Sequence, residues 1–205
     1  MKNFTSPVDI RPVQRALLLA LDKWIADDTH PPASSYGKIN DGTLVPMSDI
    51  VANFPSPIPD FSFTPNYNAI QQTDYVLTGD PLEPYKLGKN YKVLFSAIDK
   101  SGNELPGIQL PRVANPIGTY AGWNPRAAGH GENDLSEATG SWAPLAVTRE
   151  ERLETGDSRL SLNERYGSQK GWVSRVENSA DELISKGYLL PRDRDTIVSQ
   201  TMHQK

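Results

Sequence analysis

Few residues in this chain of 205 are of the types that perform acid–base or nucleophilic chemistry. There are three histidines and no cysteine, which rules out a cysteine nucleophile and a thiolate metal site. His130 and Asp134 lie four residues apart in a polar, glycine-rich loop, where the carboxylate could orient the imidazole as a general base. With Ser136 or Ser141 as the nucleophile, these residues would make an unconventional hydrolase. A solvated polar loop is the alternative interpretation.

The usual serine-hydrolase signature does not occur in the sequence. A nucleophile elbow needs Gly-x-Ser-x-Gly, because small flanking residues allow the strained turn between a strand and a helix. Residues 156–160 keep only the first half of this pattern, and Ser158 lies between two predicted helices. No His-x-x-x-His pair and no glycine-rich phosphate loop occurs either. We therefore assign no catalytic residue by motif and predict neither a metal site nor a cofactor.

The segment with the most unusual composition is residues 115–126. It combines two aromatic side chains with glycines, which let a backbone approach closely, and with amides and an arginine. Tyr120 and Trp123 offer aromatic faces, and Asn124 and Arg126 offer hydrogen-bonding groups. Such a loop suits the recognition of a small molecule or a glycan. The alternative is a structural plug, in which the aromatic loop seals the edge of a core.

A helix over residues 10–27 is the first element expected to organise these loops. Asp9 is a plausible N-cap, and apolar residues recur along the helix at three- and four-residue steps. Leu18 and Leu19 widen the apolar face, so the helix should be covered on more than half of its circumference. The face that we expect to meet a partner domain or a second copy of the chain comprises Val13, Leu17, Leu21 and Trp24.

The next part of the chain, residues 31–146, is rich in proline. Thirteen of the 17 prolines lie between residues 31 and 125, which is incompatible with long helices. Residues 42–46 are predicted to form a short strand after an Asp-Gly turn. Alternating apolar residues predict a β-hairpin over residues 91–110, with its turn at residues 99–103. Such a long irregular stretch is typical of a wrap or a lid over a larger surface.

The last part, residues 147–205, is predicted to be helical. Thr148 and Ser161 each begin a capping-box pattern, and Ser168 can cap a third helix that ends at Gly187. A final short helix should follow.

We therefore predict an α+β fold with much irregular, proline-rich coil. Its three parts are an N-terminal helix in residues 1–30, a wrap with a small antiparallel β element in residues 31–146, and a C-terminal helical cluster in residues 147–205.

Composition narrows the possible partners and compartments. The formal net charge is −4, which argues against general nucleic-acid binding because phosphates call for a basic surface. Hydrophobic residues make up 37% of the chain and no apolar run is long enough for a membrane helix, so a thin core and no membrane are expected. The N-terminal residues lack the apolar region of a signal peptide, and the default expectation is a cytoplasmic location.

Several blocks of sequence together resemble a known family. In order along the chain they are residues 9–12, 15–24, 31–36, 41–46, 110–124 and 162–167. This series is similar to the C-terminal portion of large bacterial proteins called alpha/beta hydrolase domain-containing proteins, and the match extends from about residue 6 to 199. None of the blocks is a catalytic signature.

The resemblance implies that this chain supplies a non-catalytic part of a larger hydrolase. Residues 10–27 would be the closing helix of a doubly wound hydrolase domain, and the chain from Pro31 onward would be an extension that wraps it. The strands and the nucleophile would precede the helix, so no catalytic residue of the family maps onto this chain. The expected role is an accessory one, and an esterase-like activity would belong to the larger assembly.

Overall fold

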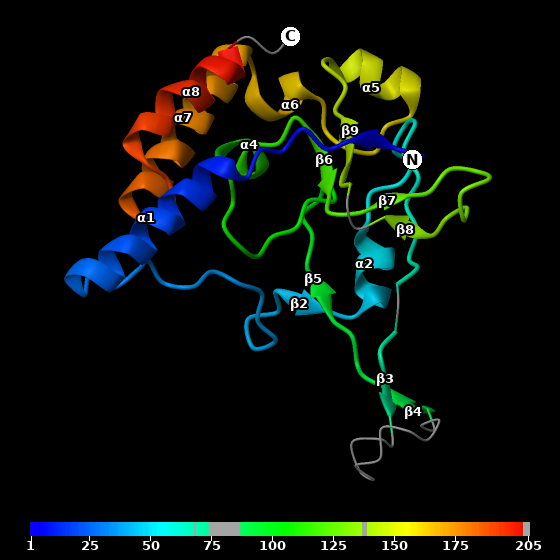
Figure 1. Cartoon of the computed structure of the whole chain (residues 1–205). Coiled ribbons are helices and arrows are strands. Elements are labelled where there is room, and N and C mark those ends of the chain that lie inside the picture. The colour runs from blue at the N-terminus through cyan, green and yellow to red at the C-terminus, as the bar shows by residue number, and fades with distance from the viewer. Residues whose placement is uncertain (68, 74–86, 137–138, 203–205) are drawn as a thin grey trace.

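The computed structural model describes residues 1–67, 69–73, 87–136 and 139–202 (Figure 1). Helices and small antiparallel sheets alternate with long irregular connections, which confirms the predicted α+β class. The C-terminal helices pack together, and short strands and loops form the rest of the body (Figure 1). No helix in the described part of the chain is long and apolar enough to cross a membrane.

Helix α1 spans Arg11–Asp27, close to the predicted range. A proline in the first turn favours this start because its missing N–H is not needed there. The predicted N-cap is wrong by one residue: Ile10 occupies that position without a side-chain cap. The carboxylate of Asp9 instead accepts a hydrogen bond from the backbone N–H of Arg11, at 3.0 Å. Asp28 ends the helix in a left-handed conformation, with φ of 54°.

A three-stranded antiparallel sheet lies near the middle of the molecule. Its order is β1 (Phe4–Thr5), β9 (Ser141–Pro144) and β6 (Gly118–Ala121). Strands β7 (Asn124–Pro125) and β8 (Leu135–Ser136) form a separate antiparallel pair. The sheet joins the N-terminus to segments more than 100 residues away.

The predicted hairpin over residues 91–110 needs correction. Strand β5 (Phe95–Ser96) pairs with β2 (Leu44–Val45), which confirms the predicted strand in residues 42–46 but gives β5 a different partner. Within the proposed hairpin, a single bridge joins Ile98 and Glu104. Pro106 follows, and a proline cannot donate a hydrogen bond to a ladder, so the return arm does not continue as a strand.

The remaining elements of the proline-rich region are short. Helix α2 spans Met47–Asn53, and helix α4 spans Pro111–Ala114. Strands β3 (Gln71–Thr73) and β4 (Leu87–Asn90) pair in an antiparallel fashion and project away from the body (Figure 1).

The predicted C-terminal helical cluster is confirmed. It consists of α5 (Arg149–Thr155), α6 (Leu162–Tyr166), α7 (Gln169–Ser185) and α8 (Pro191–Met202). Its hydroxyl caps satisfy backbone N–H groups that have no partner inside a helix. The apolar core of the cluster is formed by Trp172, Val176, Ala180, Leu183, Leu189 and Ile197.

The caps themselves follow the sequence patterns closely. Thr148 and Ser168 each accept a hydrogen bond from a backbone N–H in the first turn of their helix. Ser161 and Glu164 form the complete reciprocal capping box.

A buried ion pair in the loop between α5 and α6 is hydrogen-bonded to the central sheet. The guanidinium of Arg159 is paired with the carboxylate of Asp157, at 2.6 Å, and both side chains are almost fully buried. Arg159 also donates to the hydroxyl of Thr119 and to the carbonyl oxygens of Ala143 and Pro144. A buried charge is tolerated only when it is paired and hydrogen-bonded, and this arginine satisfies both conditions.

Candidate functional site

A cavity of about 330 Å³ lies beside the aromatic loop. Two residues that the sequence singled out, Tyr120 and Trp123, line it. The other aromatic side chains of its wall come from segments far apart in the sequence and are Phe54, Phe63, Tyr67 and Phe95. The fold therefore builds an aromatic enclosure around part of the predicted binding loop.

Ring contacts hold the wall of this aromatic cavity in place. Phe54 stacks on Phe63 with a centroid distance of 4.3 Å. Trp123 meets the edge of Phe63 at 5.9 Å and lies 6.0 Å from Phe61. Offset and edge-on arrangements of this kind are favourable for aromatic rings. Trp123 is thus half-buried in a cluster and does not project freely into solvent.

A few polar side chains interrupt the aromatic lining, namely Thr64, Asn66, Ser96 and Glu104. Apolar walls with a small number of hydrogen-bonding groups are typical of small-molecule sites. The arrangement can enclose an apolar or aromatic group and fix its orientation.

The other two residues of the predicted binding loop are placed differently. Asn124 is fully buried, and its side chain bonds to the backbone of Asn3: the Asn3 N–H donates to Asn124 Oδ1 at 3.1 Å, and Asn124 Nδ2 donates to the Asn3 carbonyl at 3.0 Å. Arg126 is exposed at the start of the polar loop. Neither residue is among the described side chains that line the aromatic cavity.

The residues of the hydrolase hypothesis are spread over different environments. His130 and Asp134 are both exposed. Ser136 is buried in β8, and Ser141 is buried in β9, where its hydroxyl donates to the Trp123 carbonyl at 2.7 Å. In the described ranges no hydrogen bond joins His130 to Asp134 or to either serine. Ser158 donates to the Pro57 carbonyl, at 3.1 Å.

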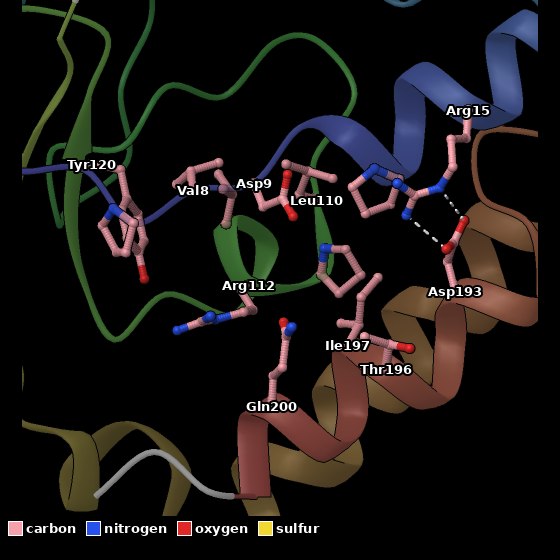
Figure 2. A pocket seen from close by; sticks show the side chains of 14 residues that line it. Val8, Asp9, Arg15, Leu110, Arg112, Tyr120, Asp193, Thr196, Ile197 and Gln200 are labelled. Atoms are coloured by element: carbon pink, nitrogen blue, oxygen red, sulfur yellow. Dashed lines mark hydrogen bonds and ion pairs between the residues drawn. The ribbon is translucent and has the colours of Figure 1, made fainter.

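A second, smaller cavity of about 70 Å³ lies where the start of α1 meets α4, β6 and α8 (Figure 2). An ion pair at its edge joins Arg15 of α1 to Asp193 of α8, at 2.7 Å. Tyr120 lines this cavity as well as the aromatic one. Burial raises the pKa of Tyr120 above its ordinary value of 10.0, because the phenolate would lose its hydration.

The sequence did not predict this second cavity. Arg112 and Gln200 line the small cavity, yet neither belongs to a motif. Arg112 lies three residues before the predicted aromatic loop. This closeness in sequence to Tyr120 was the only feature that could have pointed to Arg112. Nothing in the sequence pointed to Gln200, since α8 is brought to α4 only by the packing of the helical cluster.

The predicted docking surface on α1 is only partly covered. Val13 is buried within the chain, whereas Leu17, Leu21 and Trp24 are exposed. Leu18 and Ile25 are still more exposed, at 67% and 78%. The C-terminal half of α1 extends away from the body (Figure 1).

Titratable side chains in the part of the chain that the structure describes do not gather into a metal site. Across the described residues there is no group of three or more His, Asp or Glu side chains that could hold a metal ion.

Together, the described residues form an α+β protein in which α1 is only partly covered and a buried tyrosine lines both the aromatic cavity and the smaller cavity beside α1. A comparison with models of protein families identifies the family of the chain. Residues 2–199 match the alpha/beta hydrolase domain family, and the chain belongs to this family. No curated protein and no solved structure matches the chain.

Proposed function

We propose that this chain is the accessory, C-terminal segment of an alpha/beta hydrolase-like protein and covers a hydrolase domain without a complete catalytic site of its own. The observation that carries the proposal is the uncovered face of α1. Leu18 and Ile25 are mostly exposed, and the residues of α1 that the described chain buries, Pro12, Val13 and Ala16, all lie near the start of the helix. A contiguous exposed apolar patch of this kind marks an interaction surface.

The sheets support the same interpretation. In the alpha/beta hydrolase fold, the nucleophile sits on a turn that follows a strand of the central sheet. Every strand pair in the described ranges is antiparallel, and no strand is longer than four residues. The described strands therefore form no sheet that could present the nucleophile in the usual way.

An ester-hydrolysis assay tests this proposal directly. We expect the purified chain to release p-nitrophenol from p-nitrophenyl acetate at the rate of buffer alone. The controls are Ser141→Ala and His130→Ala, which remove the candidate nucleophile and base of the unconventional hydrolase. Saturable hydrolysis that either substitution abolishes would contradict the accessory role and would support a catalytic His130 site.

The aromatic cavity supports a second candidate function, a small-molecule binding module. Tyr120 and Trp123 both line a cavity of about 330 Å³, large enough for a single aromatic ring. Asn124 is engaged with the N-terminal backbone, which removes an amide that glycan recognition would use. Within this second function we therefore favour a small aromatic or apolar ligand over a glycan.

A further inference from the structure

The described lining of the aromatic cavity carries a single charged side chain, and this is the carboxylate of Glu104. No lysine, arginine or histidine belongs to the described lining. Glu104 is exposed, and its carboxylate makes no hydrogen bond or ion pair with a described residue; its contact with Gln109, at 3.2 Å, uses the backbone carbonyl. The described wall therefore has one negative charge and no positive charge to balance it.

The aromatic rings of the wall also favour a positive charge. The face of an aromatic ring is electron-rich, and a cation within about 6 Å of the ring centre is attracted to it. Trp123 and Phe63 meet at an interplanar angle of 61°, and Tyr67 and Phe95 meet at 68° with their centroids 5.0 Å apart. Such edge-on pairs do not use up the ring faces as face-to-face stacking would. Electron-rich rings and a carboxylate therefore surround the same space.

Among organic cations, a quaternary ammonium group suits this lining better than a primary ammonium. A primary ammonium has three N–H donors, which need acceptors when they leave water. The neutral polar side chains of the described lining are few, and the hydroxyl of Thr64 already accepts a hydrogen bond from the backbone N–H of Asn66, at 3.3 Å. A quaternary ammonium has no N–H and presents methyl groups to the rings. It can therefore enter without leaving a donor unsatisfied.

We propose that the aromatic cavity binds a small organic cation with a quaternary ammonium group, held against the ring of Trp123 and close to the carboxylate of Glu104. This ligand class rests on the second candidate function, the small-molecule binding module, and narrows it to apolar ligands that carry a positive charge. The cavity volume of about 330 Å³ lies within the range of small-ligand sites. An anion would be repelled by the carboxylate and by the ring faces alike.

An NMR titration of the full chain compares choline with 3,3-dimethyl-1-butanol, which has the same shape but a carbon atom in place of the charged nitrogen. Sodium chloride keeps the ionic strength equal in both titrations. We expect saturable amide shifts at residues 94–96 and 120–123 with choline. Choline should bind about tenfold more tightly than the neutral alcohol, because a desolvated cation–π contact contributes about that factor.

Two substitutions separate the charge of the carboxylate from the ring. Glu104→Gln should weaken choline binding about threefold, since an exposed charge pair contributes little, and should leave binding of the neutral alcohol unchanged. Trp123→Leu keeps an apolar side chain without the ring, so it should weaken choline binding about tenfold and affect the alcohol less. The matched control is Glu154→Gln, which removes an exposed carboxylate of α5 outside the described lining.

The outcomes distinguish this ligand class from the binding module itself. Equal binding of choline and the neutral alcohol would overturn the preference for a cation and leave the small-molecule module standing. Saturable shifts with neither compound would overturn both. Choline binding that is unchanged in Glu104→Gln and Trp123→Leu, with both variants folded by circular dichroism, would place the cation elsewhere on the chain. Should Trp123→Leu fail to fold, Glu104→Gln alone decides, because its side chain is exposed.

Discussion

At the scale of single residues, the aromatic loop has structural contacts and also lines the aromatic cavity. Trp123 is half-buried against Phe61 and Phe63 and also lines the aromatic cavity. Asn124, the next residue, is fully buried and ties the N-terminal strand to the body. The sequence left a plug and a binding loop as alternatives: Asn124 makes the structural contacts of a plug, and Trp123 lines the cavity on which the proposed binding role rests.

Replacing Trp123 with alanine separates these two roles. We expect Trp123→Ala to abolish binding of p-cresol, a probe that fits a cavity of about 330 Å³, and to lower the free energy of unfolding by about 2 kcal/mol because the side chain is half-buried. Saturation-transfer NMR measures the binding, and urea unfolding measures the stability. Trp24→Ala, at an exposed tryptophan of α1, is the matched control and should change neither quantity. Loss of folding in Trp123→Ala would favour the plug alone.

At the scale of elements, the short helix α6 depends on its capping box. Glu164 accepts hydrogen bonds from the backbone N–H and hydroxyl of Ser161, and it pairs with Arg152 at 2.9 Å. These hydrogen bonds lower the pKa of Glu164 from 4.5 to about 2. Because the folded chain holds the carboxylate in its charged form, the stabilisation is complete above pH 4.5 and is lost as the pH falls towards 2.

The acid dependence of unfolding tests this contribution. We expect Glu164→Gln to lower the melting temperature above pH 4.5, because glutamine keeps the hydrogen-bond acceptor but loses the charge. The difference from the wild type should shrink as the pH falls from 4.5 towards 2 and vanish below 2, where the Glu164 carboxyl is protonated in the folded chain too. Glu154→Gln removes a charge at an exposed position of α5 and serves as the control. A difference that stays constant between pH 5 and pH 2 would contradict the assignment.

At the scale of the whole molecule, α1 is a helix whose apolar side chains the rest of the described chain covers only in part. Its start packs against the body through Val13 and Ala16, and Arg15 pairs with Asp193. Its C-terminal half exposes leucine side chains to solvent, which is unfavourable for an isolated protein. The missing cover is what the proposed hydrolase domain would supply.

Without that cover, the chain should associate with itself through α1. We expect sedimentation velocity to show larger species as the protein concentration rises, and the double substitution Leu18→Glu and Ile25→Glu to suppress them. The double variant should unfold within about 0.5 kcal/mol of the wild type, because both side chains are exposed. Val13→Glu, on the buried side, should destabilise the fold. A monomer at every concentration, or association that survives the double substitution, would argue against this surface.

How far the sequence predicted the molecule depends on the range of the interactions involved. Helix positions, glycine stops and hydroxyl caps follow from residues within one or two turns, and α1, α7 and the capping box at Ser161 were found on that basis. The predicted partner of β5 was wrong. The actual partners, Leu44 and Val45, lie about 50 residues away, and strand pairing over that distance leaves no periodic signal in the sequence.

The sequence by itself determined the class of the protein, the local elements and the family resemblance, because these are carried by composition, periodicity and ordered motifs. Only the tertiary structure decided which residues share a site. It placed Trp123 in an aromatic cavity, used Asn124 to hold the N-terminus, and left the hydroxyl of Tyr120 facing Arg112. The physical reason is that a cavity is formed by side chains from distant segments, and their meeting depends on how the whole chain packs.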